Sequence, residues 1–90
     1  MPPGVIVFLN VFVESKELER VTEALAKLPE IVDVYEVTGE YDLIAIIKTD
    51  TIAHFRQILK DKILKIRGIR STVSAVVLHM HKKDGKHVSE

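Results

Sequence analysis

The chain has 90 residues, 47% of them hydrophobic, with 13 basic and 13 acidic side chains and therefore no net charge. This size is typical of one small domain with its own apolar core, and a balanced charge without a basic stripe argues against direct binding to nucleic acid. The lack of Cys excludes disulfides and thiol chemistry, and no apolar run reaches the roughly 18 residues that would span a membrane.

The chain opens with residues 1–4, a flexible lead whose sequence is not a signal peptide, so we expect a cytoplasmic protein. Residues 5–13 are rich in β-branched and aromatic side chains and predict a strand. This strand is apolar on both faces except at Asn10, which indicates a central strand covered on both sides. Ser15 is placed to cap the helix that follows, and Pro29 ends it. The apolar stripe of this helix is Leu18, Val21, Leu25 and Leu28.

A hairpin follows. Residues 31–37 predict a partly polar strand, nearer an edge of the sheet, and residues 41–48 predict a third strand that is apolar on both faces. Gly39 stands between them and can adopt the positive φ that a tight turn requires.

The next segment predicts a second helix. Asp50 or Thr51 caps its start, and Gly68 closes it as a C-cap. Its apolar stripe is Ile52, Phe55, Leu59, Ile63 and Ile66.

A fourth strand opens at Arg70 or Ser71 and runs to about Met80, and residues 81–90 form a polar, frayed tail. The elements thus give strand–helix–strand twice, joined by a hairpin. Right-handed crossovers in both halves predict an α+β, ferredoxin-like βαββαβ sandwich, with a four-stranded antiparallel sheet and both helices on one face. The first and third strands are then central, and the domain spans residues 5–80.

The face of the sheet that the helices leave open is expected to be apolar, because the central strands are apolar on both sides. Such a patch exceeds what a soluble monomer usually exposes. We therefore expect two copies to pack these faces together in a symmetric homodimer. Apolar burial at about 25 cal/mol/Å² would outweigh the cost of association.

Asp42 stands at the start of the third strand, where an apolar strand needs no carboxylate. It either caps the turn through local backbone bonds or faces a bound molecule. The start of the fourth strand carries Arg70, Ser71, Thr72 and Ser74. Hydroxyls and backbone N–H groups can hold a carboxylate and Asp42 can pair with an ammonium, so the two groups would suit a free amino acid. The alternative is that Thr72 and Ser74 are ordinary strand residues.

His79 and His81 alternate at the end of the last strand, a spacing that can ligate zinc or copper. Neither a carboxylate nor a Cys at short spacing completes such a site, so we expect solvated histidines and no metal. The sequence also contains neither a nucleophile-elbow motif nor a phosphate-binding glycine loop. We expect neither catalysis nor a cofactor.

Two segments carry a family resemblance. Residues 34–44, with the turn Thr38-Gly39-Glu40-Tyr41-Asp42-Leu43, and residues 66–74 resemble the effector-binding RAM domain of the Lrp/AsnC transcriptional regulators. The resemblance covers about residues 5–80. It implies an αβ-barrel-like dimer, rings of dimers such as octamers, and an amino-acid effector held between dimers. The ligand-binding positions that it implies are Gly39, Glu40, Tyr41, Asp42, Thr72 and Ser74.

Full-length members of that family carry a helix-turn-helix before this domain, and the sequence before residue 5 leaves no room for one. The chain therefore resembles stand-alone RAM proteins, which implies action through rings with full-length Lrp/AsnC relatives, or sensing of an amino acid, rather than direct DNA binding. Two alternatives share the fold. One is a small dimeric, cofactor-free monooxygenase with a cavity under the helices, and the other is an ACT-like regulatory module, whose glycine turn after the first strand is absent.

Overall fold

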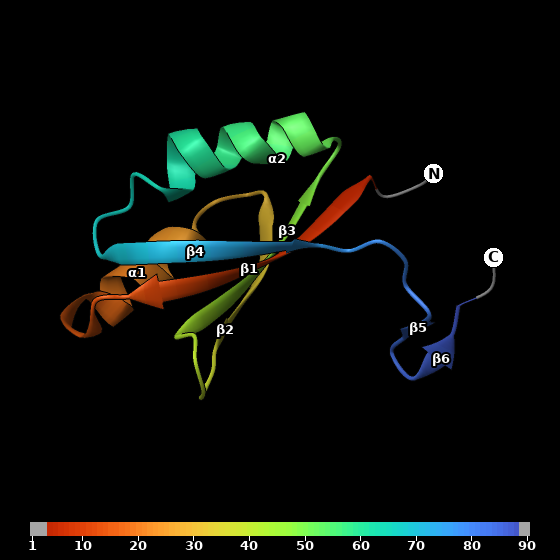
Figure 1. Ribbon diagram of the computed structural model, residues 1–90, viewed down its shortest axis with the longest axis horizontal. Helices are drawn as coiled ribbons and strands as arrows, with labels where there is room; N and C mark the ends of the chain where they lie inside the picture. Colours follow the sequence, from red (N-terminus) through yellow and green to blue (C-terminus); the bar gives the residue numbers. More distant parts are fainter. Residues whose placement is uncertain (1–3, 89–90) are drawn as a thin grey trace.

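The computed structural model describes residues 4–88 and contains a four-stranded antiparallel sheet with two helices on one face (Figure 1). The strands of this sheet are β1 (Val5–Val13), β2 (Ile31–Glu36), β3 (Leu43–Thr49) and β4 (Ile69–Val76). The helices are α1 (Leu18–Ala26), preceded by a 3-10 helix at Ser15–Glu17, and α2 (Ile52–Ile58), continued by a π-helix at Leu59–Ile63. The strand order β2-β3-β1-β4 places β1 and β3 in the middle, so the predicted ferredoxin-like fold is confirmed.

The two sides of the sheet differ in burial because side chains alternate along each strand. On the helix side of β1, Val7, Leu9 and Val11 are fully buried, whereas Phe8 on the other side is 43% exposed. The helix-side cluster continues through Leu43, Ala45 and Ile47 of β3 and Val21 and Leu25 of α1. The other side, called the open face below, contains Ile6, Phe8, Asn10, Tyr35, Ile44, Ile46, Val73 and Ala75.

The start of α1 differs from the prediction. Ser15 does not cap the helix, because a 3-10 turn follows β1 and moves the start of α1 to Leu18. Glu17 precedes the helix and makes no capping bond; its carboxylate accepts a hydrogen bond from Arg20 Nε at 2.8 Å. The helix ends at Ala26, three residues before Pro29, so the proline follows a helix that has already ended.

The second helix begins as predicted, with Thr51 as the cap: Thr51 Oγ1 accepts a hydrogen bond from the backbone N–H of His54 at 3.0 Å. The predicted stripe is wrong at its first position, because Ile52 is 45% exposed, and it omitted the buried Ile58. Ile52 lies at the start of α2, and the π-helix accounts only for the shared orientation of Ile58 and Ile63. Ile58 and Ile63 are five positions apart, one π-turn, so both point into the core.

Gly68 is not the C-cap of this helix, which ends at Ile63. It adopts φ +108° immediately before β4, where a Cβ would lie 2.6 Å from Glu17 Cβ and 2.9 Å from Val21 Cγ2. Its carbonyl accepts a hydrogen bond from Glu14 N at 2.8 Å. Gly68 therefore permits close approach of the chain to the start of α1.

The end of the chain also differs from the prediction. β4 starts at Ile69, and it ends at Val76 rather than near Met80. The tail, predicted to be frayed, forms a small hairpin from β5 (Lys82–Lys83) and β6 (Lys86–His87). Asp84 and Gly85 at its turn have φ values of 50° and 79°, and an Asp-Gly pair with two positive φ angles is a favoured hairpin turn.

Candidate functional site

The loop between β2 and β3 contains four of the six predicted ligand-binding residues. It is closed by a hydrogen bond from Val37 N to Asp42 O at 3.1 Å. Gly39 has φ +117° and a Cβ there would meet nothing within 4 Å, so glycine is favoured by conformation rather than by space. Gly39 and Glu40 are exposed to solvent. The loop therefore presents its backbone at the end of the sheet.

Asp42 fastens this loop to β1. Its Oδ2 accepts a hydrogen bond from Val13 N at 2.8 Å, and its own N–H donates to Val11 O at 3.1 Å. The register between β1 and β4 shifts here: Phe12 pairs with Ser71 and Val13 with Ile69, so Arg70 is an extra residue on β4 opposite the end of β1 to which the carboxylate bonds. Of the two predicted roles, a backbone bond is present, but its partner lies on another strand rather than in the turn.

Tyr41 lies against β1 as well. Its ring and that of Phe12 have centroids 4.8 Å apart and are tilted by 56°, a favourable aromatic geometry. Phe12, Arg70 and Ser71 line an open hollow, and Ser71 is the register partner of Phe12. The predicted residue Tyr41 thus lies close to a hollow that involves the start of β4.

The two hydroxyl residues of β4 lie apart from the loop. Thr72 pairs with Val11 and Ser74 with Leu9, so both belong to the helix side of the sheet. β1 lies between β4 and β3. Because adjacent strands are about 4.8 Å apart, β4 and β3 are about 10 Å apart. The structure therefore gathers Gly39, Glu40, Tyr41 and Asp42 in one loop, and it places Thr72 and Ser74 two strands away.

Sequence reasoning missed Phe12 and Val13, which contact this loop through a ring and a backbone N–H. The predicted strand order contained a signal for them. Antiparallel pairing of the first and third strands puts the end of one beside the start of the other, and Val11 is indeed opposite Leu43. The use of the Asp42 side chain, rather than a backbone carbonyl, as the acceptor for the Val13 N–H has no such signal.

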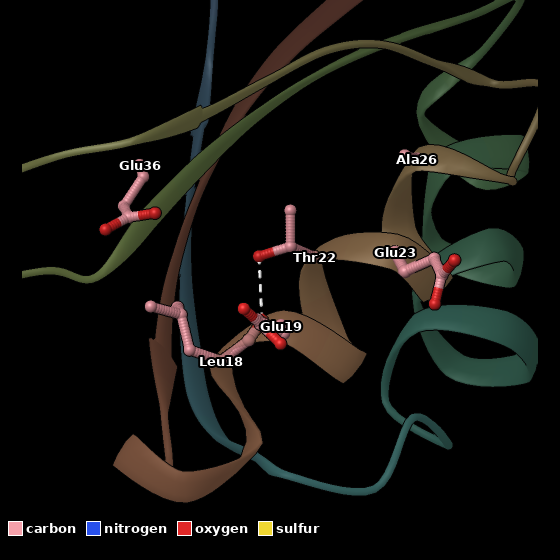
Figure 2. A pocket seen from close by; sticks show the side chains of 6 residues that line it. All are labelled: Leu18, Glu19, Thr22, Glu23, Ala26 and Glu36. Atoms are coloured by element: carbon pink, nitrogen blue, oxygen red, sulfur yellow. Dashed lines mark hydrogen bonds between the residues drawn. The ribbon is translucent and has the colours of Figure 1, made fainter.

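A larger hollow, of about 590 Å³, lies between α1 and β2 (Figure 2). Its lining residues are Leu18, Glu19, Thr22, Glu23, Ala26 and Glu36. None of the predicted ligand-binding residues contributes to it.

Other ionisable groups lie outside the loop. The Lys62 ammonium donates a 3.0 Å hydrogen bond to Glu30 Oε2, and this bond lowers the pKa of the Glu30 carboxyl. The imidazoles of His79 and His81 meet edge to face with centroids 4.5 Å apart. Within residues 4–88, groups of three or more His, Cys, Asp or Glu side chains placed to hold a metal ion are absent, and so are helices long and apolar enough to cross a membrane.

Comparison with known proteins places this fold in a class of ligand-binding regulatory domains. The family model of the Lrp/AsnC ligand binding domain matches residues 6–86. The chain therefore belongs to the Lrp/AsnC family, as the resemblance of its turn and last strand indicated. The matched stretch reaches Lys86, so it includes β5 and the turn of the C-terminal hairpin.

Relatives agree with this assignment. The HTH-type transcriptional regulator FL11 of Pyrococcus horikoshii is 38% identical over 80 residues, which are 89% of this chain and 52% of that regulator. The crystal structure of FFRP-DM1 is similar at 32% identity with a TM-score of 0.79, covering 82% of this chain and 99% of that one. The transcriptional regulator NMB0573 of Neisseria meningitidis, solved as an L-Met complex, shares the fold at a TM-score of 0.80 and 24% identity, covering 97% of this chain and 55% of that one.

Proposed function

We propose that this chain binds a small effector, an amino acid, and acts in the regulation of transcription or amino-acid metabolism through assembly with other copies. The observation that carries the proposal is the match of the Lrp/AsnC ligand binding domain over residues 6–86. The names of relatives support it, because the FL11 proteins are transcriptional regulators that share 80 aligned residues with this chain. L-Met is the ligand bound in the Neisseria neighbour of the same fold.

The loop at residues 37–42 supports an effector site. The backbone N–H groups of residues 38–41 donate no hydrogen bond within the part of the chain that the structure describes, so they are available to an effector carboxylate. Asp42 Oδ2 is engaged by Val13 N, and Asp42 Oδ1 remains for an ammonium. A charge-assisted bond of this kind is about twice as strong as a neutral one. Gly39 and Glu40 contribute exposed backbone beside these groups.

The remaining part of the effector site is contributed by other copies of the chain when they assemble. The exposed fractions of Phe8, Tyr35 and Val73 are 43%, 53% and 46%, so large apolar side chains are exposed on the open face. Packing of two open faces makes the homodimer, and dimers associate into an octamer or a similar ring with the effector between them. Thr72 and Ser74 of β4 then face the effector from a neighbouring copy. Full-length Lrp/AsnC relatives share this domain and are candidate ring partners, so the chain needs no DNA contact of its own.

The monooxygenase alternative requires a cavity lined with polar or His side chains beneath the helices. That space is filled instead by buried Val21, Leu25, Phe55, Ile58 and Ile63. A closed apolar core supports a binding module rather than an enzyme.

A thermal-unfolding screen tests the proposal. The protein is heated at one fixed concentration with each of the twenty amino acids, and a ligand at 100 times its Kd adds about 2.7 kcal/mol of stability. We expect a rise for one or a few amino acids that is lost in Asp42→Asn and kept in Asp50→Asn, a matched change at an exposed position just after the other end of β3. Equal responses to all twenty, or the same shift in Asp42→Asn as in the wild type, would refute the assignment of the site to this loop.

A further inference from the structure

The zero net charge conceals two oppositely charged halves. Residues 1–50 contain ten acidic and four basic side chains, a net charge of −6, and residues 51–90 contain three acidic and nine basic side chains, a net charge of +6. In the fold, α1 and β2 belong to the first half and α2 to the second. The helix side of the molecule therefore carries surfaces of both signs.

The acidic surface is hollowed. We call the hollow between α1 and β2 the acidic groove; its lining residues are those shown in Figure 2. The carboxylates of Glu19, Glu23 and Glu36 at this groove form no ion pair within residues 4–88. The Thr22 hydroxyl is turned back to donate to Leu18 O at 2.8 Å. The groove thus combines apolar side chains with three uncompensated negative charges.

The basic surface is a helix face. The side chains at i, i+4 spacing on α2 and its π-helical extension, with Ala53 and Gln57 beside them, form what we call the basic ridge: Ile52, Ala53, Arg56, Gln57, Lys60 and Leu64. Arg56 and Lys60 are exposed and form no ion pair among the described residues, and Asp61 borders the same surface as an acidic neighbour. Ile52 and Leu64, at the two ends, are apolar but 45% and 49% exposed.

We infer that the acidic groove of one copy receives the basic ridge of a second copy. Apolar and oppositely charged residues are present on both surfaces, as in a helix that docks into a groove. A nucleic acid or an acidic partner would account for the ridge alone and would leave the groove unmatched. Because the two surfaces differ, a single groove–ridge contact is head-to-tail and leaves one groove and one ridge free, so that further copies can extend it to a ring or filament.

This inference rests on the proposed function in one respect: the dimer must use the open face, which leaves the helix side free for groove and ridge. The contact is ionic at its rim, so it weakens as the Debye length falls from about 10 Å at 0.1 M salt to about 3 Å at 1 M. The open-face dimer is apolar and persists at 1 M salt. Salt therefore separates the two contacts.

The test uses two charge reversals of exposed residues, one on each surface. Glu19→Lys with Glu23→Lys reverses the groove, and Arg56→Glu with Lys60→Glu reverses the ridge. Molar mass is measured by light scattering at about 0.1 M and 1 M salt. We expect the wild type to have at least twice the dimer mass at low salt and to fall to the dimer at high salt. Each reversed protein stays a dimer in both, and an equimolar mixture of the two regains the larger mass, because each altered surface then meets its complement.

Lys86→Glu, a reversal on the exposed hairpin, is the control and is expected to match the wild type. The inference is overturned if the wild type is only a dimer at low salt, if either reversed protein keeps the larger assembly, or if the mixture stays dimeric. Binding of a short DNA duplex that the ridge reversal abolishes, without a larger assembly, also overturns it and names nucleic acid as the occupant. A monomer at 1 M salt instead refutes the open-face dimer of the proposed function.

Discussion

Asp42→Ala is expected to destabilise the fold, because the Asp42 carboxylate satisfies a backbone donor on β1. Val13 N lies 2.8 Å from Asp42 Oδ2, and Val13 is only 5% exposed. With alanine at position 42, this N–H loses its partner in a place that water reaches poorly. A buried donor left unsatisfied costs about 1–3 kcal/mol. A loss of about 2 kcal/mol lowers the unfolding midpoint of a domain of this size by about 8–16 °C.

The assay is thermal unfolding followed by circular dichroism at one protein concentration, since dimerisation makes the midpoint depend on concentration. Asp42→Asn is the matched variant, because the asparagine carbonyl can still accept the bond from Val13 N. We expect Asp42→Asn to melt near the wild type and Asp42→Ala well below it. Asp42→Asn also removes the negative charge, so an effector response lost in this stable variant reports the charge and not the fold.

An Asp42→Ala protein that melts within about 2 °C of the wild type would refute the reasoning, because it would show that the Val13 N–H needs no protein partner. Equal destabilisation in both variants would point to the charge of Asp42 rather than to its acceptor oxygen. Either result would remove the structural role assigned to the acceptor oxygen of Asp42.

Three further predictions concern other parts of the fold. Gly68→Ala should lose about 1–3 kcal/mol in urea unfolding, because φ is +108° and the added Cβ would lie 2.6 Å from Glu17 Cβ; wild-type stability would contradict this. Lys62→Met should lose about 0.2–1 kcal/mol at neutral pH. Because the pKa of Glu30 is lowered in the folded state, this difference from wild type is full above the ordinary carboxyl pKa and shrinks as the pH falls through the folded value, which melting curves at several pH values can check. Phe8→Glu, on the open face, should convert the dimer to a monomer in sedimentation equilibrium, and a persistent dimer would exclude that face.

Periodicity predicted the fold well because apolar alternation and helical stripes report burial directly. The sequence of β1 is apolar at both odd and even positions, and β1 is indeed a central strand. The two places where a helix departs from the regular α-helical period were not predicted. The 3-10 turn at Ser15–Glu17 moved a helix cap, and the π-helix at Leu59–Ile63 aligned Ile58 with Ile63 in the core. These irregularities depend on tertiary contacts, which local propensity does not contain.

The C-terminal hairpin was within reach of the sequence. Asp84-Gly85 is a strong turn signal, and both residues have positive φ. Strands of two residues each, at Lys82–Lys83 and Lys86–His87, are too short to show an alternating pattern. The polar composition therefore outweighed the turn signal in the prediction.

The residues of the candidate site also differ in how well the sequence predicts their positions. Gly39, Glu40, Tyr41 and Asp42 are contiguous, so any hairpin brings them together. The placement of β4 side chains depends instead on the register with β1, which no local pattern specifies.

That register decides which face of the sheet each hydroxyl occupies. Thr72 pairs with buried Val11 on the helix side, whereas Ser71 pairs with Phe12 on the open face, beside the Tyr41 ring. An effector that contacts both the loop and Thr72 of the same copy would have to reach around the end of the sheet, past Val13, which favours a Thr72 from a neighbouring copy. The bulge lies at that end, and Asp42 is bonded there. Occupation of the loop by an effector would thus act on the same hydrogen bond that fixes the end of β1, which links effector binding to the stability of the sheet edge where β4 begins.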